Sequence, residues 1–238
     1  VDWAEGKYFT GCASDDILLP SKISLLVEKL ESSDDSYSVA FGDAIFIDDN
    51  SNEVFIDRKT GEYTTEENGS KFFLDYYTFE RDFDYKDEKS FGSYKTLLAG
   101  NYLPAMSYVI KLDKIREVGA WTSGNTIEDW EMWLKLSKNY KFAYIDEPVA
   151  FYRWHDSNTC KTMKFELVRD SLQLLEEEKN YALSKGYKSA FYTTLVNLVI
   201  QLRIHNKSML IKKLIQYSIN PVFVYLFVLK LIHKIQKY

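Results

Sequence analysis

The sequence predicts an α/β protein with an α-helical extension at its C-terminal end. Over residues 1–160, short apolar segments alternate with amphipathic ones, which indicates strands and helices in turn. Over residues 161–238 this alternation gives way to three long helical stretches. The 238 residues are 46% hydrophobic and 27% charged, a globular composition that is sufficient for one buried core and an appendage.

The first elements alternate in this way. Residues 1–6 have the pattern of the last turn of a helix closed by Gly6, and residues 7–13 have that of a short buried strand. Residues 17–33 predict a helix with Pro20 in its first turn. Its apolar positions have helical spacing: Ile23, Leu26, Val27 and Leu30.

The next segments are a hairpin and a long polar excursion. Residues 37–57 predict two strands joined by a turn at 48–52. That turn partly resembles a calcium-binding loop, but Glu53 stands where such a loop needs Gly, and Lys59 stands where it needs a bidentate Glu. We therefore expect a solvated turn. Residues 58–92 predict a long excursion with some helix, and loops of this length are often functional.

Regular elements follow as far as the C-terminus. We expect a short helix and a strand over 95–112, a helix over 112–121 and an amphipathic helix over 127–139. Residues 141–155 predict two extended segments broken at Pro148. The remaining helices are predicted at 162–184, 187–205 and 208–236.

Charge is distributed unevenly. Residues 1–100 carry 22 acidic and 10 basic residues, a balance of −12, whereas residues 203–238 carry seven basic residues and no acidic one. The acidic front argues against a nucleic-acid groove and suits a cation site. Cys12 and Cys160 lack the spacing of a zinc site or a disulfide framework, which fits a reducing compartment and a cytoplasmic location.

Three clusters carry the residue types that sugar transfer from a nucleotide diphosphate needs: Ser14-Asp15-Asp16, Glu128-Asp129-Trp130 and Arg153-Trp154-His155. Carboxylates hold hard cations that neutralise a diphosphate leaving group. A further carboxylate would accept the proton of the acceptor hydroxyl as general base. A cationic Arg and an imidazole would add stabilisation near the phosphates.

Each cluster also has an ordinary structural interpretation. An acidic pair before a helix is a good N-cap, and acidic residues in a first helical turn are common. A single His is more often structural than catalytic. The order of the three clusters along the chain, rather than any one of them, carries the functional interpretation.

That order resembles the family-two inverting glycosyltransferases of the GT-A fold. The segment GKYFTGCASDDILLPSKISLLVEKL resembles the strand that carries the family's DxD motif and the helix after it. LLAGNYLPAMSYVIKLDKIREVGAW resembles the acceptor-side strand and helix, and TIEDWEMWLKLSKNYKFAYIDEPVAFYRWHDSNTC resembles the base-bearing helix and the closing segment. The resemblance covers residues 1–160 and implies a mixed sheet flanked by helices.

The resemblance implies roles for seven residues. Asp129 matches the catalytic base, and Glu128 would orient that site or the acceptor. Asp15 matches the last Asp of DxD and would bind Mg²⁺ or Mn²⁺ together with His155. The substrate-binding positions would be Asp16, Trp130 and Arg153.

The family's activity would then be the expected one. Such an enzyme transfers a sugar, as a hexosyltransferase does, from a nucleotide-diphosphate sugar to an acceptor hydroxyl with inversion. The donor is expected to be UDP-linked, the acceptor a glycan or a lipid-linked sugar, and the pathway bacterial cell-surface polysaccharide synthesis.

Two departures favour a different expectation. Ala13 occupies the position where the family often has the first Asp of DxD. The chain also begins without an initiator Met, and roughly 80–100 residues of such an α/β domain would precede it. A non-catalytic fragment or partner-binding remnant of such an enzyme is therefore the alternative function.

The tail at 208–238 leaves two interpretations open. Its longest apolar run, residues 222–229, is too short to span a bilayer. An interfacial helix would place its lysines near lipid headgroups and make the protein peripheral on the inner face of the cell membrane. Those lysines are Lys212, Lys213, Lys230, Lys234 and Lys237. Otherwise the tail packs on the domain or in a dimer contact.

Overall fold

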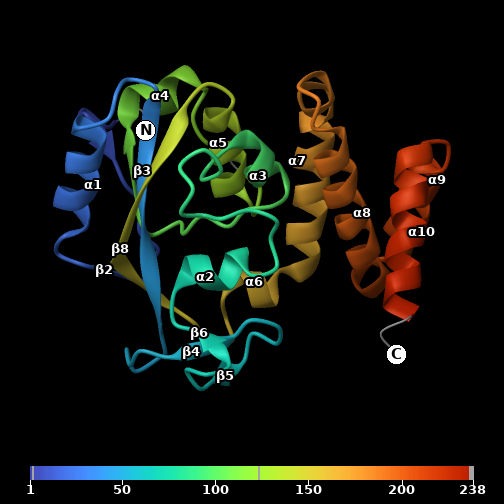
Figure 1. Cartoon of the computed structure of the whole chain (residues 1–238), viewed down its shortest axis with the longest axis horizontal. Helices are drawn as coiled ribbons and strands as arrows, with labels where there is room; N and C mark the ends of the chain where they lie inside the picture. Colours follow the sequence, from blue (N-terminus) through green and yellow to red (C-terminus); the bar gives the residue numbers. More distant parts are fainter. Residues whose placement is uncertain (2, 123, 236–238) are drawn as a thin grey trace. The chain divides into compact units, whose positions relative to one another are not determined.

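The computed structural model describes residues 1, 3–122 and 124–235. It confirms a mixed α/β protein with a C-terminal helical region, and the described residues form strands β1 to β8 and helices α1 to α10 (Figure 1). The chain divides into two compact units. The first comprises Val1–Leu97, Asn101–Thr122 and Glu128–Asn158, and the second comprises Leu98–Gly100, Ser123–Ile127 and Thr159–Tyr238.

A five-stranded mixed sheet is the centre of the first unit. Its order is β1 (Tyr8–Phe9), β7 (Tyr108–Lys111), β3 (Tyr37–Ile47), β8 (Lys141–Arg153) and β2 (Ile17–Leu18). Strands β3 and β8 run parallel, and every other pair is antiparallel. All eleven residues of β3 are buried, because β3 is paired on both sides and covered on both faces.

Neighbouring residues of β3 show the two covered faces, since successive side chains of a strand point in opposite directions. Ala40 packs in one apolar cluster with Leu26 and Leu30 of α1 (Lys22–Glu31). Phe41 instead meets the Trp133 ring of α5 (Glu128–Ser137) at 5.1 Å. Helices α1 and α5 therefore cover opposite faces of the sheet (Figure 1).

A second, three-stranded sheet follows the hairpin. Its order is β5 (Tyr63–Thr64), β4 (Phe55–Asp57) and β6 (Gly69–Ser70). The predicted hairpin closes through the bridge of Ile47 to Glu53, after which β4 leaves β3 for this second sheet. The Asp48 carboxylate accepts backbone hydrogen bonds from Asn50 and Asn52 at 2.8 Å, as expected for an Asp in a turn. The short helices of this unit are α2 (Phe73–Thr78), α3 (Tyr94–Leu98) and α4 (Leu112–Glu117).

Three local predictions for the first unit are wrong. The described residues of 1–6 are not helical, and the Ala4 amide donates to the Val1 carbonyl as in an isolated turn, which is too little to sustain a helix. Residues 17–18 were expected in a helix but form β2, because pairing with β8 overrides local propensity. Pro148 does not break β8; the pairing with β3 shifts register there, so the missing N–H falls in an irregular stretch of the ladder.

The second unit is helical, as predicted. Its helices are α6 (Thr159–Thr162), α7 (Lys164–Ser184), α8 (Lys188–His205), α9 (Lys207–Tyr217) and α10 (Pro221–Ile235). The single helix predicted over 208–236 is wrong, since α9 ends before Pro221 and α10 begins there, where a missing N–H costs no intrahelical bond. Residue 236 of that prediction, and Lys237 of the predicted interfacial lysines, lie outside the described residues. Across the residues described, no helix has the length and apolarity needed to cross a membrane.

Candidate active site

Asp15, Asp16, Arg153 and His155 lie together at the carboxyl ends of the parallel strands β3 and β8. Asp15 and Asp16 come directly before β2, and Ile17 of β2 pairs with Phe151 of β8. The Arg153 amide donates to Asp16 Oδ1 at 3.0 Å, and His155 Nε2 lies 3.0 Å from Asp15 Oδ2. In open α/β sheets this edge is where ligands bind.

The Arg153 guanidinium holds this corner in place. Its Nε donates to the Asp15 carbonyl at 2.9 Å, its Nη1 to the Asp48 carbonyl at 2.5 Å and its Nη2 to Ser51 Oγ at 3.0 Å. All three guanidinium nitrogens are thus engaged with the protein. Arg153 therefore joins the acidic loop and the 48–52 turn to the end of β8.

Two adjacent carboxyl groups have pKa values shifted in opposite directions. The hydrogen bond from His155 lowers the pKa of Asp15. Burial raises the pKa of Asp16 to about 6, against the opposing effect of its bond to the Arg153 amide. At neutral pH, Asp15 is therefore ionised and partly exposed, while Asp16 is the acceptor of the Arg153 amide.

The imidazole of His155 is oriented from both sides. Its Nδ1 lies 2.8 Å from Ser157 Oγ, and its backbone amide donates to Asn158 Oδ1 at 2.7 Å. Asn158 in turn donates to the Arg153 carbonyl at 3.0 Å. This second layer of contacts fixes the ring so that Nε2 faces Asp15.

Asp129 lies in the first turn of α5, in the same unit. Its Oδ2 accepts from Asn101 Nδ2 at 2.8 Å, and its Oδ1 accepts from the Trp130 amide at 2.7 Å. Burial, followed by repulsion from Glu128, raises the pKa of Asp129 to about 6. Such a pKa suits a general base near neutral pH.

The neighbours of Asp129 occupy different environments. Glu128 is exposed, so its contribution is the charge beside Asp129. Trp130 is buried and donates from Nε1 to the Leu97 carbonyl at 2.8 Å. The ring thus supports the start of α5, and the substrate-binding role of Trp130 stays a prediction.

Tyr108 connects the two groups of residues. Its buried hydroxyl lies against the backbone of Gly11, where an added Cβ would meet that oxygen at 2.8 Å. Burial raises the pKa of Tyr108, and the charge of Asp129 raises it further. Tyr108 therefore contacts the segment that leads to the acidic loop, and its hydroxyl is within the electrostatic influence of Asp129.

The sequence analysis did not single out Lys22, which is fully buried. Its Nζ donates to Thr10 Oγ1 at 2.7 Å, to the Gly11 carbonyl at 3.3 Å and to the Met106 carbonyl at 2.8 Å. These bonds hold the strand that leads to Asp15. A signal was present in the sequence, because Lys22 precedes Leu26 and Leu30 at four-residue spacing and so shares their buried helix face.

The site was also tested for its fit to a divalent cation. Among the described residues, no three His, Cys, Asp or Glu side chains gather into a metal-binding group. Asp15 Oδ2 and His155 Nε2 lie 3.0 Å apart and share a hydrogen bond, so a cation held by both atoms would replace that bond. This pair fits Mg²⁺ or Mn²⁺ only where water and substrate phosphates supply the remaining ligands, as Mg²⁺ commonly requires.

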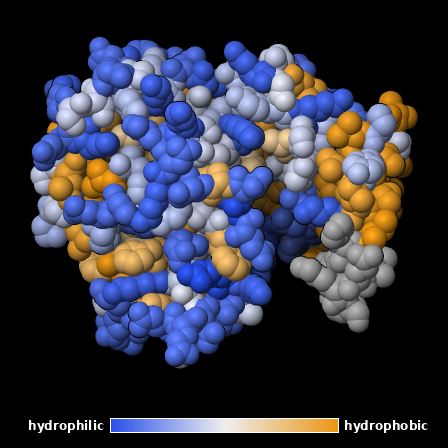
Figure 2. All heavy atoms as spheres, in the orientation of Figure 1, coloured by the Kyte–Doolittle hydropathy of each residue, from blue (hydrophilic) through white to orange (hydrophobic). Residues whose placement is uncertain are grey.

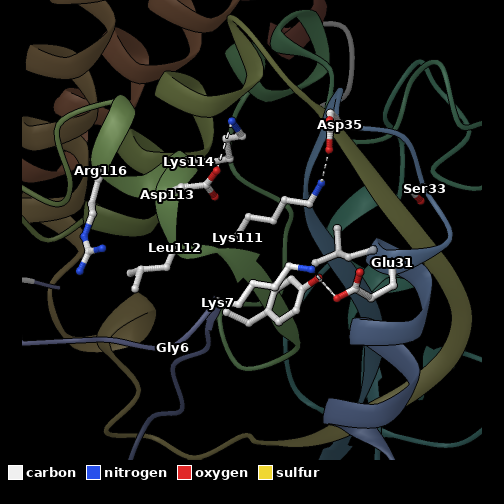
Figure 3. A pocket seen from close by; sticks show the side chains of 12 residues that line it. Gly6, Lys7, Glu31, Ser33, Asp35, Lys111, Leu112, Asp113, Lys114 and Arg116 are labelled. Atoms are coloured by element: carbon white, nitrogen blue, oxygen red, sulfur yellow. Dashed lines mark hydrogen bonds and ion pairs between the residues drawn. The ribbon is translucent and has the colours of Figure 1, made fainter.

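A separate cavity of about 450 Å³ lies at the opposite end of β3 (Figure 3). Asp35, two residues before β3 begins, lines it, whereas the acidic pair lies beyond the last residue of that strand. Two of the lysines that line it are paired with acids, Lys7 at 2.6 Å from Glu31 and Lys111 at 3.8 Å from Asp35. None of the predicted site residues lines this cavity.

Comparison with known proteins leaves the family open. A scan against protein-family models matches none of them. A search of curated proteins also finds no match.

Proposed function

We propose that this chain carries active-site residues of an inverting GT-A glycosyltransferase for both the nucleotide-sugar donor and the acceptor. The observation that supports this most is that one unit holds two carboxylates whose pKa values are shifted in opposite directions. Asp15 has a lowered pKa beside His155 and Arg153, and Asp129 has a pKa raised to about 6. One environment favours a permanently ionised ligand, the other a proton acceptor, and transfer from a nucleotide diphosphate needs both.

In this proposal the residues at the start of α5 act on the acceptor. Asp129 accepts the proton of the acceptor hydroxyl, and Asn101 holds its Oδ2 so that Oδ1 and Oδ2 keep a fixed orientation. Burial keeps the Asp129 pKa high, and the negative charge of Glu128 adds to this effect. Trp130 anchors the first turn of α5, since its ring nitrogen is bonded to a buried carbonyl.

The donor end would be organised by the corner at β8. Asp15 and His155 would hold Mg²⁺ or Mn²⁺, which neutralises the charge that develops on the leaving diphosphate. Asp16 and Arg153 maintain the backbone of that corner and add the guanidinium charge. The donor is expected to be UDP-linked and the acceptor a glycan or lipid-linked sugar.

Calorimetry with UDP and Mn²⁺ tests the proposal on this chain. Binding should be observed, should require Mn²⁺, and should be lost in Asp15→Asn but retained in Asp82→Asn, which removes an exposed acid outside the site. Asp129→Asn should bind UDP as the unmodified chain does and should show no transfer of sugar from a UDP-sugar donor.

Two results would contradict the proposed enzymatic function. Binding of UDP without dependence on Mn²⁺ or on Asp15 would remove the metal assignment. Absence of UDP binding would favour the alternative, a partner-binding remnant of such a transferase, which Ala13 in place of the first DxD acid also favours.

A further inference from the structure

The outer faces of α9 and α10 form an apolar surface that the helical unit leaves exposed. Along α9 and beyond it, Ile211, Ile215 and Ile219 recur every fourth residue, and Ile215 and Ile219 are 69% and 91% exposed. Along α10 the exposed apolar side chains have the same helical spacing: Val224, Tyr225, Val228, Leu231 and Ile232. Figure 2 shows apolar residues gathered over these two helices.

This surface belongs to folded helices whose inner faces are already packed. Tyr217 and Phe223 are buried, with their rings 5.2 Å apart, and the Tyr217 hydroxyl donates to Glu176 of α7 at 2.7 Å. Asn220 caps α10 by accepting from the Phe223 amide at 3.0 Å, and it donates to Tyr192 of α8 at 2.8 Å. The exposed residues therefore form an ordered second face and not an unfolded tail.

The charge around this surface has a single sign. Residues 203–238 contain seven basic residues and no acidic one. Lys213 turns inward to Glu176 at 2.6 Å, whereas Lys212 and Lys230 are exposed. Apolar side chains with flanking lysines match the boundary between the acyl chains and the anionic headgroups of a bilayer.

The length of the helices determines how they would meet a bilayer. The 15 residues of α10 extend about 22 Å, less than the roughly 30 Å hydrocarbon core. The helices would therefore lie in the plane of the interface. A second copy is a poorer occupant, because a two-fold contact would bring two surfaces of like charge together.

We infer that the outer faces of α9 and α10 dock the protein on an anionic lipid surface. This inference does not depend on the proposed function. The probe is a vesicle of phosphatidylcholine with phosphatidylserine, compared with one of phosphatidylcholine alone, in a co-sedimentation assay with the full chain. Binding should require phosphatidylserine and should weaken as salt is raised.

Two double variants separate the apolar and charged contributions. Ile215→Gln with Val228→Gln should weaken binding at least tenfold, while Ile23→Gln, at an exposed apolar position of α1, should leave it unchanged. Lys212→Gln with Lys230→Gln should weaken it by about fivefold for each lysine, in contrast to the exposed control pair Lys59→Gln with Lys95→Gln. Circular dichroism of each variant verifies that the helices are intact.

Three outcomes would overturn the inference. The first is no binding to either vesicle, and the second is binding that the apolar variants and the control share equally. The third is self-association of the unmodified chain in sedimentation equilibrium that Ile215→Gln with Val228→Gln abolishes, because a second copy would then cover this surface.

Discussion

Replacing the proposed base should stabilise the protein, and by more at alkaline pH than at acidic pH. The pKa of Asp129 is raised from 3.8 to about 6 in the folded state, so the unfolded chain ionises first. Between these values the native state holds more protons, and its stability falls as pH rises through that window. Asp129→Asn has no ionisable group and escapes this loss.

The size of the effect follows from the shift. A difference of about 2.2 pKa units at 1.36 kcal/mol each amounts to about 3 kcal/mol at pH 8. At pH 5 the native carboxyl is mostly protonated already, and the same linkage gives about 1.6 kcal/mol. The new amide nitrogen would face Asn101 Nδ2. Loss of that hydrogen bond lowers the stability of the variant by the same amount at both pH values. The advantage of the variant should therefore grow by about 1.4 kcal/mol between pH 5 and pH 8.

Urea unfolding followed by tryptophan fluorescence measures the free energy of unfolding of the variant and of the unmodified chain at each pH. All five Trp residues belong to the first unit, so the signal reports on the unit that holds Asp129. Asp113→Asn, which removes an exposed acid from the first turn of α4, controls for loss of a helix N-terminal charge. A stability difference that is the same at pH 5 and pH 8 would refute the buried-carboxylate reasoning.

Three other changes probe the central sheet, the helical unit and the candidate site. Gly42→Ala should cost about 1–3 kcal/mol in urea unfolding, because the added Cβ would lie 2.7 Å from Val149 Cγ1; an unchanged midpoint would show that β8 yields. Asn220→Ala should cost about 1 kcal/mol of the helical unit through loss of the α10 cap, measured by thermal circular dichroism; no change in Tm would contradict the cap. His155→Ala should raise the pKa of Asp15, followed by carboxyl ¹³C NMR, and with it the lower pH limit of the stability that Asp15 contributes; a constant pKa would show that the imidazole does not act on this carboxylate.

Local periodicity was enough to predict several elements correctly. Helix α5 was expected from the spacing of its apolar residues; Trp133 and Leu134 are indeed fully buried, and Trp133 meets Phe41 of the sheet. The strand and helix after residue 107 and the helical character of the C-terminal region were also predictable, since these patterns depend on residues a few positions apart. The preference of proline for the first position of a helix, applied to Pro221, would have divided the tail into α9 and α10.

The assembly of the candidate site required the tertiary structure. Its key bond joins Asp16 to the Arg153 amide, residues 137 positions apart, and it exists because β2 pairs with β8. No local pattern specifies that pairing, which is why residues 17–18 were predicted as helix. The opposite pKa shifts of Asp15 and Asp16 likewise come from burial and from His155, neither of which adjacent sequence encodes.

The sequence by itself determined which residue types were available for chemistry and which segments could be helices or strands. The tertiary structure alone decided that Lys22 is buried and bonded to the Gly11 carbonyl, that Tyr108 lies against Gly11, and that one face of the tail is packed while the other is exposed. The physical reason is the range of the interactions. Periodicity and capping act over one or two helical turns, whereas burial and sheet register arise between residues that only folding brings together.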